Sequence, residues 1–313
     1  MPVRALGAGL SLLGGVSLAA QARINGQLGQ RLGDGVLAAL VSFLVGLAIV
    51  VAAVAAVPAW RAAAPRFAAA VRTRRLRPWQ CLGGVAGALF VTTQGLTVPV
   101  LGVAMFTVAG VGGQVVCGLL IDRAGFGPGD ARPVTPSRAL GAVLAVVAVG
   151  IAVSDEFGTP SLLWLALLPA LTGATVAWAQ AANGLVRAAT DSVVFATLVN
   201  FAVGTVVLLL VGAVDVAVRG IPLLPPDLLL YSGGALGLIV VCTAVFAVRF
   251  AGVLMVSLCV IAGQVAGSVV LDFLAPAHGG GVAPTTLIGV AMTLVAAGAA
   301  AVPSGGGSAR VRG

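Results

Sequence analysis

The sequence contains an internal repeat that covers most of its length. Residues 83–122 align without a gap onto residues 233–272, at a constant offset of 150 positions. Both segments carry Gly-Gly-x-x-Gly near their start, then Gly-Val, then Gly-Gln, and both end in Asp. Matches this dense indicate a tandem duplication, so we expect two related halves that fold in the same way.

A second set of matches lies upstream of these segments, at an offset of 158 positions. Asn25-Gly26 recurs as Asn183-Gly184, and Ser42-Phe43-x-x-Gly46 recurs as Asn200-Phe201-x-x-Gly204. In a strongly apolar chain, a duplicated half is typical of membrane transporters built from structural repeats, whose substrate site lies between the repeats.

The composition predicts a protein that lies in a lipid bilayer. Hydrophobic residues make up 60% of the chain and charged residues only 8%, and the mean hydropathy is +1.14. A soluble domain of this composition would have too few polar groups to cover its surface. Hydropathy predicts ten segments long enough to cross a bilayer, at residues 5–21, 35–57, 80–99, 102–121, 138–153, 161–181, 193–214, 228–248, 252–271 and 284–302.

The positive charge is distributed as in a membrane protein and gives no reason to expect a nucleic-acid partner. All 17 cationic residues are arginines, and the formal net charge is +8. With a cytoplasmic N-terminus and ten crossings, 14 of these 17 arginines lie inside and only Arg23, Arg31 and Arg219 lie outside. This is the bias that the positive-inside rule predicts. The cluster from Arg61 to Arg77 could also bind anionic lipids.

Five crossings in each half predict inverted repeats, because an odd number of crossings makes the second half enter the membrane from the opposite face. We therefore expect an all-α integral membrane protein in which ten transmembrane helices form two inverted five-helix repeats. The predicted parts are a first repeat at 1–153, an external linker at 154–160, a second repeat at 161–302 and a flexible cytoplasmic tail at 303–313. Both termini would be cytoplasmic.

These motifs resemble those of the YdcZ-type inner-membrane exporters, a family of the drug/metabolite transporter (DMT) superfamily with an EamA-like fold. The resemblance is carried by Asn25, Ser42, Phe43, Gly46, Gly113, Gln114, Asp122 and Gly125, and in the second half by Asn183, Phe201, Gly204, Gly263, Gln264 and Asp272. The second half departs from the pattern, with Asn200 in place of Ser and no glycine shortly after Asp272. The resemblance implies export of small molecules across a bacterial inner membrane by two fused five-helix units.

Polar residues inside predicted transmembrane segments are the candidates for substrate binding, because lipid makes an unpartnered polar group costly. Gln114 and Gln264 occupy equivalent mid-helix positions in the two halves; an interhelical hydrogen bond is the alternative explanation. Ser42 and Asn200 could line the same cavity. Asn25 and Asn183 are further candidates, although a helix-ending Asn-Gly turn would also explain them. Gln94 has no polar counterpart in the second half.

Asp122 and Asp272 are the only carboxylates that recur in both halves. Together with Arg123 they could form ion pairs that gate the two faces of the membrane in turn. The alternative is that both carboxylates lie at solvated helix ends. No Asp or Glu falls in the middle of a predicted transmembrane helix, which weakens a role in proton coupling.

Nothing in the sequence points to catalysis, a metal or a cofactor. The glycine-rich run at 26–35 lacks the Gly-Lys-Ser/Thr ending of a phosphate-binding loop. We therefore expect a gradient-driven or passive alternating-access exporter of a small, partly apolar solute, acting as a monomer or homodimer. A non-transporting membrane scaffold, in which the Gln and Gly motifs serve helix packing, and a lipid-carrier flippase are the alternatives.

Overall fold

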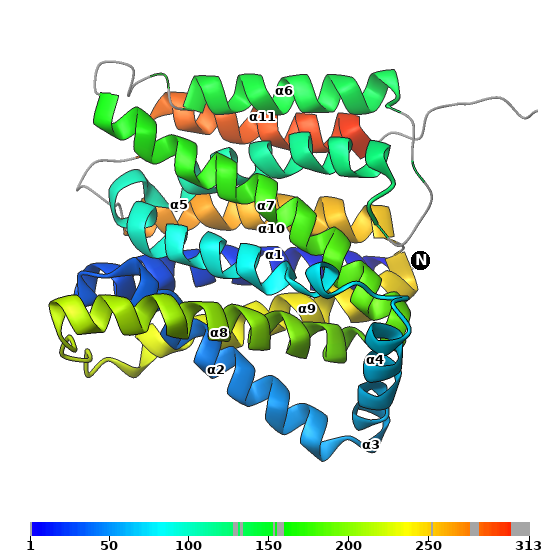
Figure 1. Cartoon of the computed structure of the whole chain (residues 1–313). Helices are drawn as coiled ribbons and strands as arrows, with labels where there is room; N and C mark the ends of the chain where they lie inside the picture. The colour runs from blue at the N-terminus through cyan, green and yellow to red at the C-terminus, as the bar shows by residue number, and fades with distance from the viewer. Residues whose placement is uncertain are drawn as a thin grey trace, which may run out of the picture.

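The computed structural model describes residues 2–127, 131, 134–152, 154, 160–251, 253–275 and 282–301. Most of the predicted linker and the predicted tail lie outside these residues. Throughout the described part the regular secondary structure is helical, without strands, and most of the helices lie side by side in one bundle (Figure 1).

The helices follow one another in two similar series. The first comprises α1 (Pro2–Leu32), α2 (Gly35–Ala56), the short α3 (Pro58–Arg61) and α4 (Ala63–Arg72), the 3-10 turn η1 (Pro78–Cys81), α5 (Gly83–Ala124) and α6 (Pro136–Ala152). The second comprises α7 (Pro160–Thr190), α8 (Val193–Arg219), the 3-10 turn η3 (Leu228–Tyr231), α9 (Gly233–Ala251), α10 (Val253–Leu274) and α11 (Pro284–Ala301).

Helix α5 contains two of the predicted transmembrane segments joined through a break at Gly102. The break is local, because Gly102 has φ 80° and ψ 166° while helix continues on both sides of it. A positive φ of this size strains any residue with a Cβ, which explains glycine here. The corresponding segments of the second half are α9 and α10.

Five helices are long and apolar enough to cross a membrane, among the residues that the structure describes. They are Ala5–Leu32, Gly35–Ala56, Pro78–Ala124, Trp164–Thr190 and Val193–Arg219. Shorter apolar helices cover Pro136–Ala152, Cys259–Leu274 and Pro284–Ala299.

Helices α1 and α7 extend well past their predicted ends. Helix α1 continues to Leu32 and α7 continues to Thr190, so Asn25 and Asn183 lie inside helices and the predicted Asn-Gly turns are wrong. The glycine-rich run that starts at Gly26 is likewise mostly helical. The tight connections come later, where Asp34 and Ser192 accept hydrogen bonds from the first turns of α2 and α8. These residues are N-caps at the same 158-residue offset.

The two halves exchange their first helices. Helix α1 packs on α9 and α10 of the second half, and α7 packs along α5 of the first half. Helices α2 and α8 pack on each other, and α6 packs on α11. Figure 1 shows α6 and α11 together along one edge of the bundle, with α2 near the opposite edge.

Repeated glycines make these contacts possible. A Cβ added at Gly113 would overlap the carbonyl oxygen of Ala170 on α7, and one at Gly263 would overlap that of Leu12 on α1. A Cβ at Gly84 would likewise overlap the carbonyl oxygen of Asn200, and one at Gly234 would overlap that of Ser42. Small residues let helix backbones approach closely without side-chain overlap.

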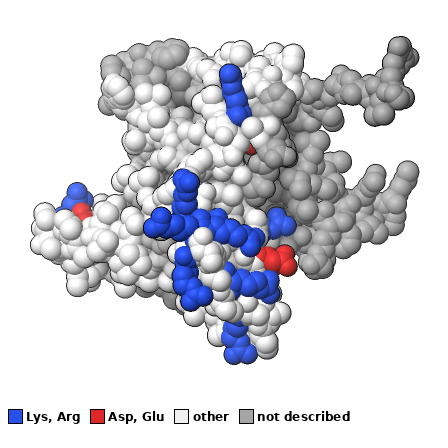
Figure 2. Space-filling view, turned by 45° about the vertical axis from the view of Figure 1, so that its right-hand side comes forward, with Lys and Arg blue, Asp and Glu red and all other residues white. Residues whose placement is uncertain are grey.

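Helices α3 and α4 form a basic corner of the molecule. Ala63, Phe67 and Ala70 of α4 pack towards Val186 and Phe195, while the exposed arginines between Arg61 and Arg77 form the blue cluster at the bottom of Figure 2.

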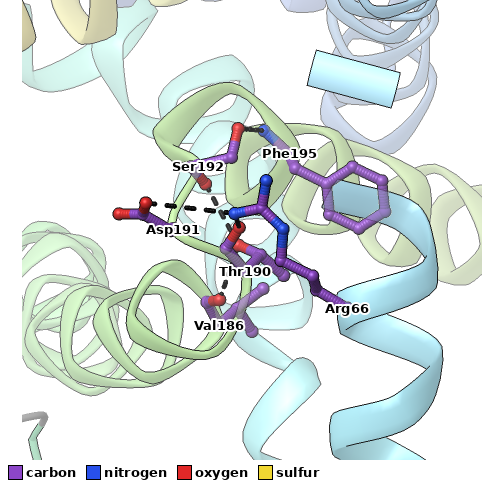
Figure 3. Close-up of polar contacts among 6 residues, drawn as sticks. All are labelled: Arg66, Val186, Thr190, Asp191, Ser192 and Phe195. Carbon is purple, nitrogen blue, oxygen red and sulfur yellow. Dashed lines mark hydrogen bonds and ion pairs between the residues drawn. The ribbon is translucent and has the colours of Figure 1, made fainter. Parts of the chain in front are cut away.

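Arg66 joins this corner to the turn between α7 and α8. Its guanidinium donates a hydrogen bond to the Thr190 carbonyl oxygen at 3.0 Å and lies 3.9 Å from a carboxylate oxygen of Asp191 (Figure 3). The contact is largely exposed, with the Asp191 side chain 98% accessible, so we assign it an orienting role and little stability.

Candidate functional site

A cavity of about 770 Å³ lies between the two halves. It is lined by α1, α2 and α5 of the first half and by α7, α8, α9 and α10 of the second, with Arg138 of α6 at one end. A cavity of this size falls in the range of small-molecule sites, which are mostly apolar with a few polar groups.

Five of the six predicted substrate-binding residues line this cavity. They are Gln114, Gln264, Ser42, Asn183 and Asn200. Asn25 does not line it, because it is fully buried beside it and donates a hydrogen bond to the Gln94 side-chain oxygen at 2.7 Å. Gln94 itself lines the cavity, so Asn25 positions a lining amide and is not a lining residue.

The asparagines and Ser42 also lie against the starts of α5 and α9. Asn183 donates to the Asn200 side-chain oxygen at 2.9 Å, and a Cβ at Gly83 would lie 2.6 Å from the Asn183 side-chain oxygen. In the other half, a Cβ at Gly233 would overlap the Asn25 side-chain oxygen and lie 2.8 Å from Ser42 Oγ. These residues therefore fix how α1 and α2 meet the start of α9, and how α7 and α8 meet the start of α5.

Gln114 and Gln264 face the cavity from α5 and α10. Gln264 is 7% exposed and Gln114 is half-buried. Neither amide forms a side-chain hydrogen bond with another described residue, so the interhelical hydrogen bond considered as the alternative is not formed within the described part of the structure.

Sequence reasoning missed several lining residues. Gln21 and Gln180 lie on α1 and α7, and their spacing of 159 puts them one residue out of the repeat, which is why the repeat did not reveal them. Four phenylalanines also line the cavity, at positions 43, 90, 106 and 201. The Phe43–Phe201 pair could have been found, since both belong to the repeated Phe-x-x-Gly motif.

One end of the cavity reaches an ion pair between Asp122 and Arg138. The Asp122 side chain is 41% exposed and the Arg138 side chain 21%. Arg123, the residue predicted to pair with Asp122, is exposed, and the partner of Asp122 is Arg138.

Asp272 lies beyond the other end of the cavity and is not a solvated helix end. It is 6% exposed and accepts hydrogen bonds from the backbone N–H groups of Val103 at 2.9 Å and Ala104 at 2.6 Å. These N–H groups start the helix that resumes after Gly102, so Asp272 caps the broken helix from the other half. Arg23 lies 3.9 Å from Asp272.

A packed apolar cluster separates Asp272 from the cavity. Ala19 and Ala22 of α1 meet Val98, Val103 and Phe106 of α5, all at most 1% exposed. On α5 the cavity lining includes Gln94 and Phe106 but none of the residues between them. The cavity is therefore blocked towards Gly102 and extends towards Asp122.

A protein-family model matches most of the chain. The model of the family described as "Putative inner membrane exporter, YdcZ" matches residues 6–151 and again residues 164–299. No curated protein matches the chain. The two matched segments are the two series of helices whose repeated residues line the cavity.

Proposed function

Because the chain belongs to the YdcZ family of inner membrane exporters, we propose that it exports a small, partly apolar solute by alternating access through the cavity between its halves. The single observation that carries this proposal is that repeat-related residues from both halves converge on the cavity. Gln114 and Gln264 are one such pair, and Ser42 and Asn200 are another. A site at a repeat interface is the arrangement that alternating access requires.

The proposal includes ten crossings arranged as two inverted repeats. The exchanged packing of α1 and α7, the paired contacts of α2 with α8 and of α6 with α11, and the break that divides α5 support it. The arginine bias supports cytoplasmic termini. In this orientation Asp122 lies on the cytoplasmic side, Asp272 on the external side, and the cavity extends to the cytoplasm.

Asp272 and Asp122 act as the gate residues in this proposal. Asp272 holds the external side closed, since it ties α10 of one half to the break in α5 of the other. Asp122 is its repeat equivalent on the cytoplasmic side. It pairs with Arg138 and does not hold that side closed. Arg123 takes no part in the gate. One carboxylate thus lies at a closed gate and the other at an open gate, and alternating access would exchange these two states.

Transport would be gradient-driven or passive. No nucleotide-binding motif occurs in the sequence, so a solute gradient or a coupled ion would supply the free energy.

The test is drug and metabolite efflux from cells that express the protein. Replacing Gln114 and Gln264 together by Leu should abolish the efflux that the wild-type chain confers, while the variant still folds. Gln27→Leu is the control, because Gln27 is exposed on α1 and does not line the cavity. If the folded double variant behaves as wild type, the scaffold alternative replaces the transporter.

A further inference from the structure

The charge of the cavity lining restricts which solutes it can hold. Among the described residues that line it, Asp122 and Arg138 carry the formal charges, and they pair with each other at one end. The remaining described lining is neutral. The buried carboxylate of Asp272 does not line the cavity; it accepts hydrogen bonds from two backbone N–H groups and lies near Arg23.

The polar groups inside the cavity are amides and hydroxyls with unused hydrogen-bonding capacity. Ser42 Oγ and Thr107 Oγ1 belong to lining residues and are buried, with no hydrogen-bond partner in the part of the chain that the structure describes. The Gln114 and Gln264 amides have none among the described residues. Buried polar atoms in folded proteins are nearly always satisfied, so a solute that donates and accepts hydrogen bonds would complete these groups.

Aromatic rings supply the apolar part of the lining. Phe43 and Phe201 lie with their ring centroids 5.1 Å apart, and Phe90 and Phe106 lie 5.2 Å apart. Both pairs are tilted, with interplanar angles of 52° and 56°. Phe90 and Phe201 are partly exposed, while Phe43 and Phe106 are buried beside them, so the two partly exposed rings offer an apolar surface that suits a flat apolar group.

An ion in this cavity would leave water without gaining a counter-charge. Amides and hydroxyls offset part of the desolvation cost of an ion, but an unpaired buried charge remains costly. Using the Asp122–Arg138 pair as a counter-ion would break that pair. We therefore infer that the solutes are uncharged molecules that combine a flat apolar part with amide- or hydroxyl-type hydrogen-bonding groups. This inference rests on the proposed function and names its substrate class.

Benzamide, benzoate and benzamidinium test this inference, because the three are nearly isosteric and are neutral, anionic and cationic at neutral pH. We expect benzamide to raise the unfolding temperature of the detergent-purified protein with an apparent Kd about tenfold or more below that of either ion. The Gln114→Leu, Gln264→Leu variant should lose the response to benzamide, and Gln27→Leu should keep it.

The inference is overturned if benzoate or benzamidinium stabilises the protein as much as benzamide or more. It is also overturned if none of the three compounds raises the unfolding temperature. Benzoate binding that disappears in Arg138→Gln would place an anion at the Asp122–Arg138 end, which also contradicts a neutral solute. The efflux test decides the proposed function independently of these binding results. If charged probes bind and the glutamine double variant abolishes efflux, the transporter stands and only its substrate class is wrong.

Discussion

A single buried carboxylate connects the two halves where the backbone of α5 is interrupted. Asp272 accepts from two N–H groups that the break at Gly102 leaves without partners in their own helix. Gly102 is needed both for its positive φ and for space, since a Cβ there would lie 2.9 Å from Asp272 Oδ2. The carboxylate and the glycine therefore depend on each other.

Replacing Asp272 by Ala should lower the free energy of unfolding by about 2 kcal/mol, because two buried N–H groups would lose their acceptor. Asp272→Asn, which retains one acceptor oxygen, should cost less. Denaturant unfolding in detergent measures the difference. Asp122→Ala is the matched comparison at the partly exposed ion pair and should cost less, about 1 kcal/mol or under. If the two alanine variants lost the same free energy of unfolding, the capping role of Asp272 would be contradicted.

At the scale of elements, the closest helix contacts depend on glycines that the sequence repeats. Gly84 of α5 lies against the backbone of α8, and Gly234 of α9 lies against the backbone of α2. The contacts join different halves in both cases. They require a hydrogen atom in place of a side chain, because the neighbouring atom is a main-chain carbonyl oxygen that cannot rotate away.

Gly84→Ala and Gly234→Ala should each destabilise the protein by about 1–3 kcal/mol, since the helices must separate to accept the methyl group. Gly150→Ala is the control, because nothing lies within 4 Å of a Cβ at Gly150 on α6. It should leave stability unchanged or raise it by up to about 1 kcal/mol, the helix preference of alanine over glycine. Thermal unfolding ranks the three variants by stability. A loss of stability in Gly150→Ala as large as in Gly84→Ala would contradict the role of close helix packing.

The apolar helices and the repeat-related polar residues of the lining were predictable because they depend on local patterns. Hydropathy gave the apolar segments, and the repeat singled out Gln114 and Gln264. The lengths of α1 and α7 were not predictable, since tertiary packing keeps Asn25 and Asn183 helical where an Asn-Gly pair would otherwise favour a turn. The hydrogen bond from Asn25 to Gln94 and the cap from Asp272 to α5 join distant parts of the chain, and no local signal encodes them.

At the scale of the whole molecule, exposed arginines gather on the corner formed by α3, α4 and the segment that follows (Figure 2). The apolar side of α4 packs on the protein, and apart from Arg66, which contacts Thr190 and Asp191, the exposed arginines can face lipid headgroups. Trp79 is 38% exposed beside them, as aromatic residues at a membrane interface often are. We propose that this basic corner binds anionic lipid on the cytoplasmic side.

Nanodiscs test this proposal. Anionic phosphatidylglycerol should raise the unfolding temperature of the protein above its value in zwitterionic phosphatidylcholine, because each arginine near an anionic surface contributes about 1 kcal/mol. A variant with Gln at positions 72, 74, 75 and 77 should lose most of this difference. Arg31→Gln, exposed in α1 outside this corner, should keep it. The same response in both variants would show a general charge effect.

The exchange of first helices between the halves also governs when each part of the chain can fold. Helix α1 is made before the helices it packs on, because α9 and α10 follow it in the chain by about 200 residues. The face of α1 that packs on them includes Gly14 against Thr243 of α9 and Gly15 against the Val260 carbonyl oxygen of α10, and it must therefore wait in the bilayer until α9 and α10 are made. A ribosome that stalls before α9 would leave that face without its partners, as a target for membrane quality control.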